Sequence, residues 1–271
     1  MAKVPNEDYK KEITTKSIYP TEEIELPSKG LIYPEDNPLS SGVINMKYMT
    51  ASEEDILSSQ NLIKRGVVLD KLFEAMITSD INYRDLILGD KDAIMVASRI
   101  LGYGKDYKVK VICPSCDEPD DLDIDLTNLK DKEICESLLN RDNEFEFITL
   151  KNKDKIIFKL LTIADDKNIE AELKSFKTIQ DKSKNKNQST REFTTRLKYM
   201  IKSINGDPNK NIIRKYVDTM LSTETSAFRK HLKTINPGID MSYVFECKEC
   251  GYTTIRRIPM TVQFFWPDAE L

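Results

Sequence analysis

The chain has 271 residues, enough for one large domain or two small ones with a buried core. Its 41 Lys and Arg against 45 Asp and Glu give a net charge of −4, so the molecule has no overall positive field for indiscriminate nucleic-acid binding. The single histidine, His231, excludes a three-histidine zinc site, and nine glycines leave no Walker loop. Because His231 flanks an apolar helical face, we expect it to pack rather than to catalyse.

The sequence also argues against a membrane span, a signal peptide and disulfide bonds. The longest stretches without a charged side chain, residues 37–46 and 258–267, are about half as long as a membrane span. Residues 1–8 contain acids and lack the apolar core of a signal peptide, which argues against export. Five cysteines, an odd number, then favour thiols and metal over disulfides.

The N-terminal part of the chain is expected to form an arm and a strand before a group of helices. Residues 1–23 are polar and contain two prolines, which predicts an arm without a fold of its own. The segment after it is rich in turns, and apolar and polar residues alternate over 43–48, which predicts a half-buried strand. Together with the helices that follow, this segment would make one unit over residues 24–106.

Helix signals follow this strand. Thr50 and Glu53 have the spacing of a capping box, which predicts a helix that ends at Gly66. A third helix is expected to begin at a cap formed by Asp90 and to end at Gly102. Between them, a second helix would bury one face made of Leu69, Leu72, Phe73 and Met76.

Strand patterns replace helical ones at residue 107. Residues 107–112 and 122–126 alternate as the two strands of a hairpin, and a second hairpin is expected at 145–148 and 156–160. The acidic residues from 117 to 125 lack the EF-hand pattern, so we expect a solvated strand face rather than a calcium site.

Residues 164–238 return to the helical period and form the largest predicted helical region. One of its helices would carry Ile201 and Ile204 on its apolar face. The predicted caps in this region are Ser189 with Glu192, Asp207 with Pro208, and Ser222. Each helix has one apolar face, so the helices must pack on other elements to bury it.

Two CxxC motifs follow predicted strands: Cys113 with Cys116, and Cys247 with Cys250. Two residues between cysteines let both thiolates bind one tetrahedral ion, and two such motifs complete a Cys₄ zinc site. The motifs are 130 residues apart, against roughly 15 to 20 in an ordinary ribbon. Closing such a loop costs on the order of 4 kcal/mol, whereas structural zinc supplies roughly 10 to 16 kcal/mol, so we expect one shared zinc.

Two alternatives to the zinc site remain, namely turns that keep this shape without metal, and a redox pair. The acid-rich residues 117–121 argue against the redox pair. They are not expected to form the helix that follows a redox motif, and their negative charges would not lower the pKa of the thiol. Cys135 is expected to be a buried small hydrophobe that takes no part in metal binding.

These elements predict an α+β fold in which helical layers surround a split zinc-ribbon-like β hairpin module. The module would be built from residues 107–163 and 239–271, with 164–238 as an inserted helical region. Near its end stand three adjacent aromatic residues, Phe264, Phe265 and Trp266. A strand buries alternate residues, so three adjacent rings imply burial on both faces or a partner surface, and we expect partner binding.

The motifs also occur in a distinctive order. They are residues 25–30 with Tyr33 and Pro34, residues 49–57, residues 88–91 with Arg99, residues 102–104, the two CxxC motifs and residues 264–267. In this order they resemble the baseplate hub proteins and hub-assembly chaperones of T-even-like contractile-tailed bacteriophages. The resemblance covers nearly the whole chain after about residue 22.

The resemblance implies a non-enzymatic protein that acts while the central hub of the tail baseplate is assembled, as a hub subunit or as a chaperone. Its partners would be baseplate hub or tape-measure proteins, with a second copy of the chain as a further option. Its location would be the virion tail baseplate or the host cytoplasm.

A competing hypothesis is a phage zinc-ribbon factor that binds nucleic acid or acts in transcription, with residues 182–202 as its basic face. Net acidity and the lack of aromatic residues that could stack on bases argue against it. A salt titration separates the two hypotheses, because phosphate contacts weaken steeply with salt.

Overall fold

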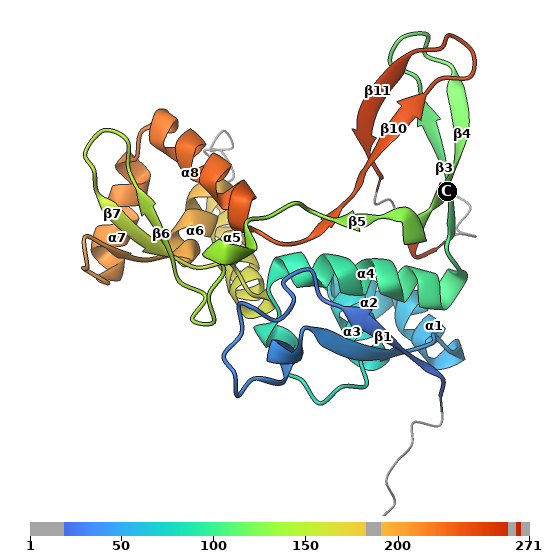
Figure 1. The fold of residues 1–271 in the computed structure, drawn as a ribbon, viewed down its shortest axis with the longest axis horizontal. Helices are drawn as coiled ribbons and strands as arrows, with labels where there is room; N and C mark the ends of the chain where they lie inside the picture. The colour runs from blue at the N-terminus through green and yellow to red at the C-terminus, as the bar shows by residue number, and fades with distance from the viewer. Residues whose placement is uncertain (1–18, 183–190, 260–263, 267–271) are drawn as a thin grey trace, which may run out of the picture.

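The computed structural model describes residues 19–182, 191–259 and 264–266. Within these ranges the fold is mixed α/β with small antiparallel sheets, and Figure 1 shows three parts. An N-terminal lobe carries a four-stranded extension, which we call the cysteine module, and a second lobe lies at the opposite end of the molecule. No helix in the described part of the chain is long and apolar enough to cross a membrane.

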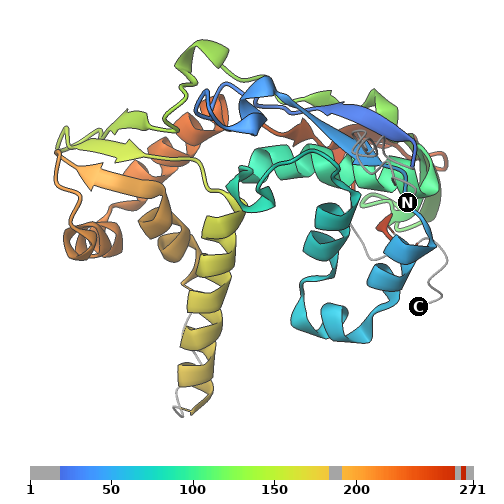
Figure 2. The ribbon, with the colours of Figure 1, turned by 90° about the horizontal axis from the view of Figure 1, so that it is seen from below.

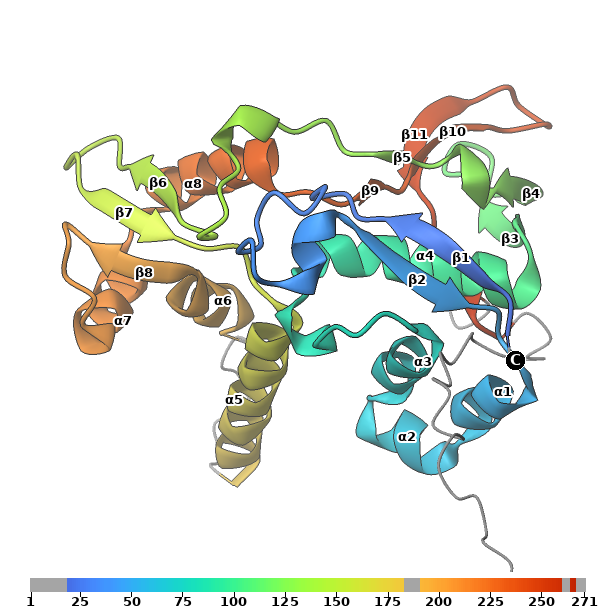
Figure 3. The same cartoon turned by 60° about the horizontal axis from the view of Figure 1, so that its bottom comes forward.

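The N-terminal lobe combines a two-stranded ribbon with helices. Its elements are β1 (Thr21–Glu25), β2 (Val43–Lys47), α1 (Ala51–Ser58), α2 (Gln60–Arg65), α3 (Val68–Met76), α4 (Leu88–Tyr103) and two 3₁₀ helices, Pro38–Ser41 and Tyr83–Asp85. The ribbon lies along α4 (Figure 3). The predicted strand is β2, where Ile44 and Met46 are buried and alternate with more exposed residues.

The capping box at the start of α1 is confirmed. The Glu53 carboxylate accepts hydrogen bonds from the Thr50 backbone N–H at 3.0 Å and from the Thr50 hydroxyl at 2.6 Å. The helix expected to run from there to Gly66 is interrupted, because Ser59 has extended backbone angles that separate α1 from α2. Gly66 does end α2, in the left-handed conformation that favours glycine.

Asp90 is not the predicted helix cap. Helix α4 begins at Leu88, and the Asp90 carboxylate instead accepts from the Ser28 N–H at 2.9 Å, the Ser28 hydroxyl at 2.7 Å and the Tyr33 hydroxyl at 2.6 Å. Desolvation raises the pKa of Asp90 to about 6 against the opposing effect of these donors. The predicted end at Gly102 is also wrong, because the helix continues to Tyr103 and Gly104 follows it.

The cysteine module consists of two hairpins. One pairs β3 (Asp106–Ile112) with β4 (Pro119–Asp125), and the other pairs β10 (Ser242–Glu246) with β11 (Thr253–Arg257). The predicted alternation in β3 is confirmed, since Tyr107, Val109 and Val111 are buried and the lysines between them are exposed. The module projects from the N-terminal lobe beyond α4 (Figure 1).

The second lobe is a three-stranded sheet with four helices. Its elements are β6 (Phe145–Ile148), β7 (Lys155–Phe158), β8 (Ile201–Ile204), α5 (Ile163–Lys182), α6 (Glu192–Met200), α7 (Lys210–Thr219) and α8 (Ser222–Ile235). The predicted hairpin is β6–β7, and α5 extends away from the body of the lobe (Figure 2). His231 packs as expected, with ring centroids 5.7 Å from Phe147 and 5.9 Å from Phe158.

Several predicted details of the second lobe are wrong. Ile201 and Ile204 do not continue a helix; they lie in β8, which pairs with β7, and both are buried. Asn209, rather than Asp207, caps α7 through a hydrogen bond that its side chain accepts from the Asn211 N–H, and α8 begins at Ser222 itself. Ser189, half of the predicted capping box, lies outside the described residues.

Two short segments connect the three parts. Strands β5 (Lys130–Asp131) and β9 (Ile239–Asp240) pair beside α4, with the 3₁₀ helices Leu126–Asn128 and Glu136–Leu138 on either side of β5 (Figure 3). Gly89 approaches this connection so closely that a Cβ atom there would lie 2.0 Å from the Pro237 carbonyl oxygen. This contact explains why α4 carries glycine in its first turn.

Candidate metal centre

The two CxxC motifs meet at the tip of the cysteine module. The loop from β3 to β4 carries Cys113 and Cys116, and the loop from β10 to β11 carries Cys247 and Cys250. All four Sγ atoms lie within 4.8 Å of one another. Two sulfur pairs across the hairpins are 3.7 Å apart. Tetrahedral Zn–S bonds of about 2.3 Å would place the sulfurs roughly 3.8 Å apart, so the spacing suits this ion.

The two cysteine loops have the same backbone arrangement. The Asp117 N–H donates to the Cys113 carbonyl at 3.0 Å, and the Gly251 N–H donates to the Cys247 carbonyl at 2.9 Å. The residue after each motif is left-handed, with φ of 59° at Asp117 and 70° at Gly251. Glycine adopts this conformation without a Cβ penalty, and aspartate tolerates it better than most residues.

Local hydrogen bonds favour a thiolate at Cys113. Its side chain is buried, which opposes ionisation, but the Ser115 N–H donates to its Sγ at 3.4 Å. Despite burial, the backbone N–H groups of Ser115 and Cys116 lower the pKa of Cys113 to about 7. The thiolate is the metal-binding form of cysteine, and these N–H donors favour that form at Cys113.

A buried carboxylate also joins the two hairpins. Asp120 on β4 accepts from the Lys248 Nζ at 2.6 Å and from the Lys248 N–H at 3.3 Å. These donors lower the pKa of Asp120. The expectation of a solvated acidic face is therefore wrong at Asp120, which is 8% exposed, because it faces the other hairpin.

The fifth cysteine lies apart from this cluster. Cys135 is exposed rather than buried as predicted, and its Sγ contacts the Ser137 hydroxyl at 3.2 Å. The apolar neighbours that suggested burial do not cover it: Leu138 is 47% exposed.

The aromatic run near the C-terminus is an internal contact. Phe264 and Phe265 are 1% and 3% exposed, and their rings lie 5.0 Å from Tyr107 and 5.9 Å from Phe73. Trp266 is half-buried and donates from Nε1 to the Leu57 carbonyl at 3.2 Å. The expectation of a partner surface is thus corrected for Phe264 and Phe265, because neither residue is in a strand and each ring packs on a different aromatic residue of the same chain.

Comparison with known proteins identifies one family. Residues 20–266 match the family described as T4 bacteriophage base plate protein. No curated protein and no solved structure matches the chain. Because the family match covers most of the sequence, this chain belongs to the T4 bacteriophage base plate protein family and works in the phage tail baseplate or in its assembly within the host.

Proposed function

We propose that this protein acts in assembly of the central hub of the baseplate, as a hub subunit or an assembly chaperone, and that its four clustered cysteines hold one structural zinc ion. The observation that carries the zinc proposal is the convergence of four sulfurs within 4.8 Å from two hairpins far apart in the sequence. The hub proposal is supported by the order of the motifs within a baseplate family.

The ligand set favours a structural ion over a catalytic one. A Cys₄ site fills all four tetrahedral positions with protein sulfur and leaves none open for water or substrate. The four cysteines lie in the two loops at the end of the cysteine module, and this module projects from the N-terminal lobe (Figure 1). We therefore propose a non-enzymatic role, in which the ion stabilises the structure of the cysteine module and takes part in no reaction.

The cysteine module needs such an ion, because an isolated two-stranded hairpin is marginally stable in water. Part of the outer face of the module is apolar and exposed, with Val244 at 69% directly opposite Ile255 at 75%. Little burial therefore stabilises this side of the β10–β11 hairpin. Zinc binding, worth roughly 10 to 16 kcal/mol, would connect it firmly to the β3–β4 hairpin.

A fixed, projecting module gives the protein a defined surface toward other baseplate proteins. Hub or tape-measure proteins are the partners we propose, with the exposed pair Val244 and Ile255 as part of the contact. The aromatic residues Phe264 and Phe265 are not included, because they are buried within the chain.

Disruption of the gene during infection tests this function. Tails assembled without the protein should lack an intact central hub, and a plasmid copy should restore it, whereas a Cys247→Ser copy should not. Mass spectrometry of purified virions then separates the two roles, because a hub subunit is retained and a chaperone is not. Complete hubs in the absence of the protein would contradict the proposal.

A further inference from the structure

The second lobe contains a hollow of about 580 Å³ whose wall is mainly basic. We call it the basic hollow and define it by the five cations that line it, Lys159, Lys198, Lys202, Lys210 and Arg214. The two carboxylates in the wall belong to Asp165 and Glu172. An excess of cations is unexpected here, because the whole chain has a net charge of −4.

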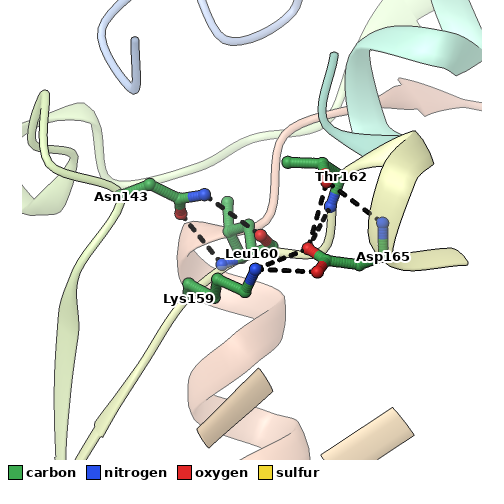
Figure 4. Close-up of polar contacts among 5 residues, drawn as sticks. All are labelled: Asn143, Lys159, Leu160, Thr162 and Asp165. Carbon is green, nitrogen blue, oxygen red and sulfur yellow. Dashed lines mark hydrogen bonds and ion pairs between the residues drawn. The ribbon is translucent and has the colours of Figure 1, made fainter. Parts of the chain in front are cut away.

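Both carboxylates of the wall already have partners in the fold. Asp165 caps the start of α5: it accepts from the Thr162 N–H at 3.1 Å and binds the Lys159 Nζ at 2.7 Å (Figure 4). Asn143 exchanges two hydrogen bonds with the Leu160 backbone, at 2.9 Å and 3.0 Å, and so fixes the chain next to Lys159. Glu172 accepts from the Tyr199 hydroxyl at 3.1 Å.

The cations differ in how they are compensated. Lys198 forms an ion pair with Asp218 at 2.7 Å, and Lys202 forms one with Glu144. Neither Asp218 nor Glu144 lines the hollow. Lys210 and Arg214 have no ion-pair partner among the residues that the structure describes, and both are exposed. They lie four residues apart on α7, where like charges repel. This uncompensated pair therefore makes the hollow attractive to an anion.

The rest of the wall indicates what kind of anion fits. Pro208 is exposed and contributes apolar surface among the charges, and the small exposed parts of Ile201 and Ile213 add to it. Tyr199 is the one aromatic residue among the described lining residues; it is half-buried and its hydroxyl is engaged, so the hollow has no open ring on which a nucleic-acid base could stack. A peptide that combines carboxylates with aliphatic side chains matches both properties of the wall.

We propose that the basic hollow binds an acidic peptide segment of another baseplate protein, and that Lys210 and Arg214 select it. Helices α6 and α7 and strand β8, which carry most of the lining residues, lie at the other end of the molecule from the cysteine module (Figure 1), so the site does not depend on the proposed zinc. It would give the protein a second contact, of opposite character to the apolar outer face of the cysteine module.

Fluorescence anisotropy with the full chain tests the proposal. The probe is a labelled ten-residue peptide of six Glu and four Leu, compared with the same peptide carrying Gln in place of Glu and with a ten-nucleotide oligo(dT). We expect the Glu peptide to bind at least about tenfold more tightly than either comparison, with an affinity that falls as salt rises. Adding a chelator should leave binding of the Glu peptide unchanged, so that this result can be told apart from a failure of the proposed zinc site.

The double variant Lys210→Gln/Arg214→Gln should weaken binding of the Glu peptide about fivefold or more. The matched control is Lys64→Gln/Arg65→Gln, an exposed basic pair on α2 in the other lobe, which should change binding less than about twofold. Unchanged melting temperatures would show that both variants fold. Equal binding by wild type and the Lys210/Arg214 variant would overturn the proposal. So would equal binding of the Gln peptide, tighter binding of oligo(dT), or displacement by millimolar inorganic phosphate at constant ionic strength.

Discussion

The N-terminal lobe and the cysteine module each contain antiparallel hairpins, but they stabilise them differently. In the lobe, the β1–β2 ribbon lies along α4, Ile44 and Met46 are fully buried, and the Asp90 carboxylate ties Ser28 and Tyr33 to α4. In the cysteine module, the ends of the two hairpins meet through the four cysteines and through the contact of Asp120 with Lys248, and the Val244–Ile255 pair on β10–β11 is exposed. The comparison indicates that apolar burial stabilises the lobe, whereas we propose that metal binding by the four cysteines stabilises the end of the module.

The largest expected effect comes from breaking the cluster. Cys247→Ser should abolish zinc binding and remove roughly 10 kcal/mol or more of metal-binding free energy from the module. Hydrogen exchange should then become fast in β3, β4, β10 and β11 while α3 and α4 stay protected. Cys135→Ser is the matched control, because Cys135 is exposed and outside the cluster. Loss of protection in α4 as well would mean that the two parts are not separable in this way.

The reverse experiment removes burial from the lobe. Phe73 is fully buried in α3 and contacts Phe265, so Phe73→Ala should lower the free energy of unfolding by about 3 to 5 kcal/mol. Urea denaturation measures this change, and zinc content per folded chain should not change. Ile63→Ala, at a 40% exposed site on α2, should cost less than about 1 kcal/mol. Similar costs at both positions would contradict the assignment of the core.

The buried carboxylate of the lobe predicts a pH dependence. Because desolvation raises the folded-state pKa of Asp90 to about 6, the folded chain binds a proton more tightly than the unfolded chain between about pH 4 and pH 6. The contribution of Asp90 to stability should therefore fall by about 2 to 3 kcal/mol as the pH rises through this window, and stay constant above it. In Asp90→Asn this contribution is absent. Unfolding free energies of both proteins from pH 4 to pH 7 test the sign, and a difference that does not change with pH would refute it.

The smallest effect concerns the turn after the second motif. Gly251 has a φ of 70°, and a Cβ atom added there would meet no neighbouring atom within 4 Å, so Gly251→Ala should cost only the conformational penalty, about 1 kcal/mol. Gly251→Asp should cost less, because Asp117 adopts the equivalent conformation in the other loop. Thermal melting of the zinc-loaded proteins ranks the two variants. An equal or larger loss for the aspartate variant would show that the loops are not equivalent.

The sequence predicted those parts of the fold that depend on interactions between residues close in the chain. The capping box of α1 and the β3–β4 hairpin depend on residues close in sequence, and both were predicted. The convergence of the two CxxC motifs, 130 residues apart, could be anticipated because thiolate chemistry, rather than chain proximity, links them.

The errors arise where distant residues decide the outcome. Asp90 has the local signature of a cap, but its donors are 62 and 57 residues away at Ser28 and Tyr33. Ile201 and Ile204 are three residues apart, which fits one face of a helix. They lie instead in a strand, because this segment pairs with the free edge of β7. Phe265 packs on Phe73 in α3, and the residues next to Phe265 in the sequence give no sign of this distant contact.

The proposed structural zinc ion, held by the four cysteines, can be detected directly. The measurement is X-ray absorption spectroscopy at the zinc edge on protein purified without chelator, with the zinc content determined by elemental analysis. We predict one zinc per chain, with four sulfur ligands at about 2.3 Å. Absence of zinc, or a first coordination sphere containing nitrogen or oxygen, would rule out a Cys₄ zinc site.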